Sequence, residues 1–224
     1  VVSISQSGET MDTLMAVKYA REQGAKTLSI CNTQGATIPR ESDAVVYTHA
    51  GPEIAVASTK GFLAQVVACY LLALYFAQVK GVKYADEISR IIDQLEQIPA
   101  AVGHVLASTD QVRELARELV DEGSFMFLGR HVGFPIALEG ALKLKELAYI
   151  HAEGFAAGEL KHGPIALIDE NMPVVLIAPK DTVYGKIVSN IEEVKARGGR
   201  VIAIVNEKDA EMTRLTDFCF VIPT

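Results

Sequence analysis

The chain has 224 residues, and half of them are apolar, which is enough to bury a sizeable core. Its formal net charge of −7 argues against nucleic acid as the main partner, because phosphate backbones favour basic surfaces. The three scattered cysteines form no C-x-x-C pair, which indicates a reducing, cytoplasmic location. The five histidines lack metal-ligand spacing, so we expect no metal site.

Short apolar runs alternate with helical segments along the chain. An apolar run at residues 1–5 predicts a strand, and an amphipathic helix follows at 10–23 and ends at Gly24. Apolar runs bounded by turn residues and separated by helices predict an α/β protein with parallel sheets covered on both faces. The further strand-like runs are 27–32, 44–49, 124–130, 173–179, 200–207 and 218–223.

One stretch, residues 62–79, is apolar enough to resemble a membrane span. It only just reaches the required length and contains Gln65 and Gln78. We therefore favour a helix that is buried in the protein core or in a subunit interface, and we expect no membrane partner. The N-terminus also lacks the basic start and the cleavage site of a signal peptide.

A repeat is present within the chain. Residues 20–32 align without a gap with residues 194–206, and Gly24 lies over Gly198, an offset of 174. The same offset brings Asp43 onto Asp217, which favours a duplication over a chance likeness between α/β units. We expect a first copy at 1–100 and a second at 101–224, with two linking helices at 85–120.

The repeat also predicts that both copies are truncated. The strand at 124–130 and the helix after it open the second copy, and their counterparts in the first copy would precede Val1. The long helix expected at 54–79 would have its counterpart after Thr224.

The segment Ser5-Gln6-Ser7-Gly8-Glu9-Thr10 follows a predicted strand and opens a predicted helix. A helix N-terminus offers free backbone N–H groups and a partial positive charge, which suit a phosphate dianion. Three hydroxyls and an amide add neutral donors, and Gly8 permits a tight turn. An ordinary helix N-cap is the alternative, because Ser or Thr at a helix start is common. The second copy has Pro179-Lys180-Asp181 at this place, so we expect the loop in one copy only.

Three motifs carry a family resemblance: SQSGET at 5–10, GPEIAVASTK at 51–60, and the stretch at 138–164 that contains GALKLKE and GELKHGP. Together they resemble the sugar-isomerase (SIS) domains of the isomerising glutamine–fructose-6-phosphate aminotransferases. The resemblance implies two tandem SIS subdomains, each a parallel sheet flanked by helices. It also implies a homodimer that converts fructose 6-phosphate and glutamine to glucosamine 6-phosphate and glutamate, without a metal or an organic cofactor.

The same resemblance implies roles for particular residues. Glu146 corresponds to a proton-moving carboxylate, and Lys143 to a lysine of the same site. His162 corresponds to a ring-opening histidine that reaches into the neighbouring subunit. Because Glu139, Lys143 and Glu146 share one helix face, an exposed salt-bridge ladder is the plainer interpretation of their spacing. The residues implied in sugar-phosphate binding are Ser5, Gln6, Ser7, Thr10, Val56 and Ser58.

The sequence departs from the family pattern at both ends. The family's glutaminase domain, with its N-terminal nucleophilic Cys, does not precede Val1, and the tail with the Schiff-base lysine does not follow Thr224. We therefore expect this chain to be inactive alone. Two alternatives remain open: a related SIS deglycase that acts on fructosamine phosphates, and a non-catalytic sugar-phosphate sensor.

Overall fold

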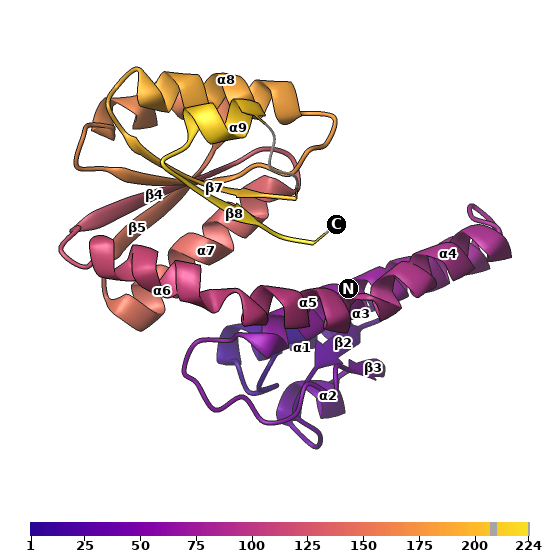
Figure 1. The fold of residues 1–224 in the computed structure, drawn as a ribbon. Coiled ribbons are helices and arrows are strands. Elements are labelled where there is room, and N and C mark those ends of the chain that lie inside the picture. The colour runs from indigo at the N-terminus through magenta and orange to yellow at the C-terminus, as the bar shows by residue number, and fades with distance from the viewer. Residues whose placement is uncertain (207–209, 224) are drawn as a thin grey trace. The chain divides into compact units, whose positions relative to one another are not determined.

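A computed structural model of the chain describes residues 1–206 and 210–223 (Figure 1). The chain forms two compact units, Val1–Glu96 and Gln97–Thr224. Each unit contains one parallel sheet with helices packed on it, which confirms the predicted α/β class. The predicted boundary between subdomains at residue 100 stays a prediction.

The first unit contains a three-stranded parallel sheet in the order β1-β2-β3. Along β1, the side chains of Ser3 and Ser5 are buried, whereas Val2 and Ile4 are about half exposed. Helices α1 and α2 pack together through Leu14, Val17 and Ile38. The strands are β1 (Val2–Ser5), β2 (Leu28–Cys31) and β3 (Ala44–Tyr47), and the helices are α1 (Met11–Glu22), α2 (Thr37–Glu41), α3 (Lys60–Val79) and α4 (Ala85–Glu96).

The second unit contains a five-stranded parallel sheet in the order β5-β4-β6-β7-β8. Helices α8 and α9 lie over one face and α6 and α7 lie over the other (Figure 1). The strands are β4 (Ser124–Gly129), β5 (His151–Ala156), β6 (Pro173–Ile177), β7 (Arg200–Val205) and β8 (Phe218–Val221). The helices are α5 (Ile98–Ala107), α6 (Thr109–Glu118), α7 (Gly133–Ala148), α8 (Tyr184–Lys195) and α9 (Ala210–Leu215), with short 3₁₀ turns η1 (Ala157–His162) and η2 (Pro164–Leu167).

The predicted repeat is confirmed in the backbone. Strand β2 pairs with β3 as β7 pairs with β8, with Leu28 opposite Ala44 and Ile202 opposite Phe218. The preceding helices end alike, because Gly24 and Gly198 adopt left-handed φ values of 78° and 82°. Both glycines donate their backbone N–H to a carbonyl three residues earlier at 2.9 Å. The helix, the glycine stop and the two strands therefore recur in register.

Three expectations about single elements were wrong. Residues 85–118 form three helices rather than two, because breaks fall at Gln97, just before Pro99, and at Ser108. The long helix begins at Lys60 rather than near residue 54, since the segment before it is an irregular loop. Strand β5 was not predicted; its sequence, HAEGFA, lacks the continuous apolar run of a central strand because β5 lies at the sheet edge.

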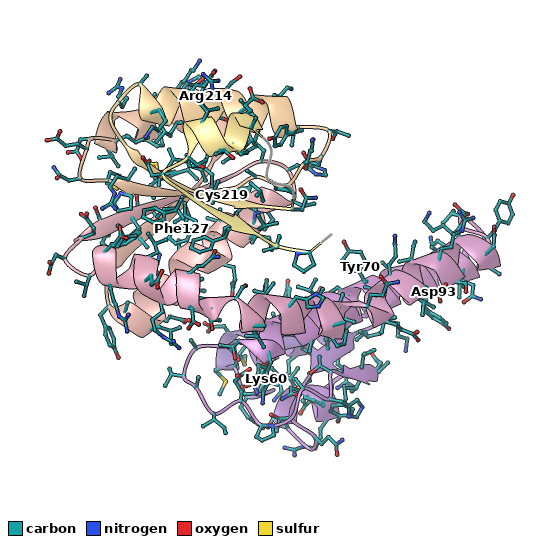
Figure 2. The ribbon with its side chains drawn as sticks, in the orientation of Figure 1. Lys60, Tyr70, Asp93, Phe127, Arg214 and Cys219 are labelled. Atoms are coloured by element: carbon teal, nitrogen blue, oxygen red, sulfur yellow. The ribbon has the colours of Figure 1, made fainter. Side chains whose placement is uncertain are left out.

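Helix α3 has 20 residues and a mean hydropathy of 1.9, so it is long and apolar enough to cross a membrane. A single helix of this kind is weak evidence for a membrane span. Few of its side chains are buried, and Tyr70 is 54% exposed, so the described chain itself leaves most of α3 uncovered. Figure 2 labels Lys60, at its start, and Tyr70. A subunit interface on α3 stays a prediction.

Candidate functional site

The Ser5–Thr10 loop joins the end of β1 to the start of α1, at the carboxyl edge of the first unit's sheet. The Ser5 hydroxyl accepts the Gly8 N–H at 3.0 Å and lies 3.3 Å from the Thr10 hydroxyl. Gly8 adopts a left-handed φ of 70°, and a Cβ there would meet the Cβ of Ala36 at 2.5 Å. The loop therefore closes tightly over β1, and this position requires glycine.

The start of α1 is open to an anion. Thr10 is its N-cap residue, but no side chain within the described part of the chain caps the helix. The first backbone N–H groups of a helix have no partner inside it, and they carry the positive end of its dipole. Ser7 and Thr10 are exposed beside these groups, and Gln6 is half-buried. Hydroxyls, an amide and free N–H groups thus belong to one loop and one helix start, a combination that suits phosphate binding.

The acidic residue of the loop, Glu9, is turned toward α2. Its carboxylate accepts the Thr37 N–H at 2.8 Å. Hydrogen bonds from the hydroxyl and the backbone N–H of Thr37 lower the pKa of Glu9 below its ordinary value. The negative charge is therefore held at the start of α2, and the loop can accept a second anion at α1.

The segment that contains Val56 and Ser58 lies beside this loop. A Cβ built on Gly61 would lie 3.0 Å from the Ser58 hydroxyl oxygen and 3.5 Å from Cγ of Gln6. The structure thus brings the two motifs of the first unit together. The Ser58 hydroxyl is buried and has no hydrogen-bond partner in the described chain, whereas Val56 is fully exposed.

Helix α7 of the second unit contains Lys143 between two carboxylates. Its Nζ lies 2.8 Å from Glu146 and 3.4 Å from Glu139. Partial burial opposes the charged form of Lys143, but the hydrogen bond to Glu146 and the attraction of Glu139 outweigh it and raise the pKa of Lys143. The three residues do form the expected ladder, and the side chain of Glu146 is the most exposed of the three, at 37%.

Glu146 and His162 lie at opposite ends of the second unit's sheet. Glu146 is in the last turn of α7, whose 16 residues span about 24 Å from the carboxyl edge of the sheet. Strand β5 then returns to the carboxyl edge, where His162 ends the turn η1. One copy of the unit does not bring them into a common site.

His162 is exposed, and its Nε2 lies 3.9 Å from Glu159. The turn before it is tied to the sheet and to α8. Lys161 forms an ion pair with Glu193 at 2.9 Å, and the buried Asn190 donates to the same carboxylate at 3.2 Å. Arg130, at the end of β4, donates to Asn190 at 2.9 Å. This chain of contacts presents His162 to solvent on an anchored turn.

No group of three metal-ligating side chains comes together within residues 1–206 and 210–223. Cys31, under the Gly8 turn, is a buried free thiol, and burial raises its pKa. Glu53, which binds the start of α3, was not predicted from the sequence. Its signal would have been an acidic residue shortly before the hydroxyl-rich start of a helix.

The two parallel sheets, each flanked by helices, have the SIS fold, and the SIS domain model matches residues 1–75 and 118–224. The chain belongs to the SIS-domain family. It is 63% identical over its whole length to the glutamine–fructose-6-phosphate aminotransferase (isomerising) of Streptomyces coelicolor and 58% identical to that of Corynebacterium glutamicum. It spans 37% and 36% of these proteins. Among solved structures, the C-terminal domain of glucosamine–fructose-6-phosphate aminotransferase from Francisella tularensis is 41% identical with a TM-score of 0.93, covering 99% of this chain and 63% of that one.

Proposed function

We propose that the chain is the isomerase part of an aminotransferase that makes glucosamine 6-phosphate, and that it binds fructose 6-phosphate. The observation that carries this is the uncapped start of α1, surrounded by the donors of the Ser5–Thr10 loop. A phosphorylated sugar supplies the dianion that such a helix start prefers. The aminotransferase relatives match the whole chain at 57–63% identity, which favours this function over a deglycase or a sensor.

The proposed roles follow the chemistry of each group. Ser5, Gln6, Ser7 and Thr10 hold the phosphate, and Val56 and Ser58 line the sugar pocket. The Glu146 carboxylate moves a proton between C1 and C2 of the sugar, which an aldose–ketose shift requires. Lys143 holds that carboxylate in place through their 2.8 Å contact. His162 opens the sugar ring, since an imidazole can both accept and donate a proton near neutral pH.

The partners follow from the same proposal. Because one unit keeps Glu146 and His162 apart, a single reaction that uses both draws them from two copies. We therefore propose a homodimer, for which the exposed apolar side chains of α3 offer a surface. A glutaminase domain in the same full-length protein would supply ammonia. We further propose a cytoplasmic location, with no membrane or nucleic-acid partner and no metal or organic cofactor.

Calorimetry with fructose 6-phosphate and with fructose tests the proposed function. We expect the phosphate ester to bind far more tightly, and Ser7→Ala to weaken it about ten-fold or more, because one hydrogen bond to a charged group is lost. Ser189→Ala is the matched control, since that serine is exposed on α8 and bonds only its own helix, at Gly185. Equal affinity for the two sugars would rule the proposal out.

A further inference from the structure

Glu53 lies in the loop between β3 and α3, and its carboxylate binds the start of α3. Oε2 accepts the Gly61 N–H at 2.9 Å and the Thr59 N–H at 3.4 Å. Oε1 accepts the Thr59 hydroxyl at 2.9 Å. Hydrogen bonds from the Gly61 backbone and the Thr59 side chain lower the pKa of Glu53, which therefore stays ionised at neutral pH. One carboxylate thus holds both Thr59 and Gly61, which follow Ser58 and begin the helix.

This contact gives the two helix starts of the first unit different properties. The positive end of α3 is already matched by the Glu53 carboxylate, whereas no described side chain caps α1. A phosphate dianion at α3 would meet the like charge of Glu53 directly on the helix N–H groups. The acidic residue in the first turn of α1, Asp12, is exposed and forms no hydrogen bond to that helix start within the described residues. The phosphate is therefore directed to α1, and the start of α3 is left to a neutral part of the ligand.

Glu53 also lies against the groups expected to contact the sugar. The point where a Gly61 Cβ would lie is 2.8 Å from Oε2 of Glu53, 3.0 Å from the Ser58 hydroxyl and 3.5 Å from Cγ of Gln6. All three side chains converge on space that only glycine leaves open. Movement of the carboxylate would shift Thr59 and Gly61, and with them the adjacent Ser58.

We propose that Glu53 is a positioning residue for sugar binding. Its carboxylate fixes the start of α3 so that Ser58 lies beside Gln6, while the phosphate is bound separately at α1. This inference rests on the proposed sugar-phosphate function. It assigns the two halves of the ligand to two helix starts and makes Glu53 the residue that keeps them distinct.

The test compares Glu53→Gln with Glu87→Gln. The amide introduced by Glu53→Gln removes the negative charge and replaces one acceptor oxygen with an NH2 donor, so the Thr59 hydroxyl and the two backbone N–H groups can no longer all donate to it as they do to the carboxylate. Glu87 is the matched control, because its carboxylate accepts the Tyr84 N–H at 2.9 Å before α4 and its pKa is lowered in the same way. Affinities for fructose 6-phosphate and for inorganic phosphate are measured by calorimetry, and folding is checked by thermal unfolding.

We expect Glu53→Gln to bind fructose 6-phosphate about ten-fold more weakly and inorganic phosphate unchanged, whereas Glu87→Gln changes neither affinity. Glu53→Asp keeps the charge but withdraws it by one methylene, so it should lose less affinity for fructose 6-phosphate than Glu53→Gln does. It serves as the test variant if Glu53→Gln does not fold. Unchanged fructose 6-phosphate binding in a folded Glu53→Gln would overturn the inference. So would an equal loss for both ligands, since the phosphate loop itself would then have moved. If the unaltered chain binds phosphate but shows no preference for fructose 6-phosphate over fructose, the proposed function fails first.

Discussion

The two units share a scaffold and differ at the loop where a ligand would bind. In both, an Asp before the last strand accepts the first backbone N–H of the neighbouring strand region: Asp43 from Thr27 at 2.8 Å and Asp217 from Val201 at 2.7 Å. The recurrence of these bonds, with the recurring strand register, shows that the repeat extends to side chains. The shared parts are those that hold the sheet together.

The loops before α1 and α8 show the difference. In the first unit the loop before the helix carries neutral hydroxyls, those of Ser5, Ser7 and Thr10. In the second, Asp181 stands where the first has Ser7. Its carboxylate accepts the Val183 N–H at 2.8 Å, as the Ser7 hydroxyl accepts the Glu9 N–H at 3.2 Å, and it adds a negative charge before α8. A carboxylate beside a helix start repels a phosphate dianion, whereas a neutral hydroxyl does not. The comparison teaches that a common scaffold can present neutral hydroxyls before a helix in one copy and a carboxylate in the other.

The second difference concerns the sheet faces. In the first unit, α3 contacts β2, and Ile30 is fully buried. The residue of β7 at the same place, Ile204, lines an apolar hollow of about 920 Å³ together with Ile202 and Phe220. The same strand position is therefore closed by a helix in one unit and open in the other.

The largest expected effect is at Glu146, and it tests whether the second unit moves the proton while the first binds the sugar phosphate. We expect Glu146→Gln to reduce proton exchange at C1 and C2 by about 10²–10⁴-fold with little change in sugar-phosphate affinity, because the amide keeps the shape but cannot accept a proton. The measurement is solvent-deuterium exchange into the sugar by NMR. It is made in a chimera in which this chain replaces the matching part of the Streptomyces coelicolor relative.

The control is Glu139→Gln, which removes the other carboxylate that contacts Lys143. Exchange at the unaltered rate in Glu146→Gln would leave Glu146 as a member of a helix ladder only.

Gly8→Ala should destabilise the first unit by about 2–4 kcal/mol, since it combines a left-handed residue with overpacking. The new Cβ would meet Ala36 at 2.5 Å and the Cys31 sulfur at 2.9 Å. Gly24→Ala is the matched control: its φ is 78° but no atom lies within 4 Å of its Cβ, so we expect about 1 kcal/mol. Chemical denaturation, with hydrogen exchange as the readout for each unit, measures the loss of unfolding free energy in both variants. Equal losses would mean that the loop yields easily around Gly8.

Asp43 and Asp217, which each accept a backbone N–H from the neighbouring strand region, should contribute differently to stability as the pH falls. Burial acts to raise the pKa of Asp217, but the Val201 N–H and the Lys195 ion pair at 2.9 Å overcome it and lower the pKa. A lowered pKa contributes stability above the unfolded value of about 3.9, and this stability is lost as pH falls through the folded pKa. We expect Asp217→Asn to cost about 1 kcal/mol after allowance for solvent screening.

Asp43→Asn should cost less, because its ion pair with Lys26 is longer, at 3.8 Å, and that lysine is 92% exposed. Exchange rates of the Val201 and Thr27 amides, followed from pH 7 down to well below the unfolded pKa of about 3.9, compare the two. A larger effect at Asp43 would show that the backbone bond, and not the ion pair, dominates.

Sequence patterns predicted the elements that repeat or that carry a strong period. The apolar runs placed every strand of the described chain except β5, and the glycine stops placed the helix ends of the repeat. Strand β5 was missed because an edge strand needs only one apolar face, and HAEGFA has too few apolar residues to show it. The loop of hydroxyls was visible in the sequence, but Glu53 and the separation of Glu146 from His162 depend on tertiary contacts and on chain direction.

The smallest expected effect concerns Ser58, whose hydroxyl is buried without a hydrogen-bond partner in the described chain. An unpaired buried hydroxyl costs stability, so Ser58→Ala should leave the free protein as stable or more stable, by up to about 1 kcal/mol. If that hydroxyl turns to meet the sugar, the same change should weaken fructose 6-phosphate binding while inorganic phosphate binding is retained. Thermal unfolding and calorimetry measure the two effects. Ser42→Ala is the contrasting control, since that hydroxyl donates to the Ile38 carbonyl at 2.9 Å and its loss should destabilise the unit without weakening the sugar contact. A Ser58→Ala variant that is less stable and binds normally would show that Ser58 serves packing alone, and the sugar contacts would then have to come from the other side chains of the loop.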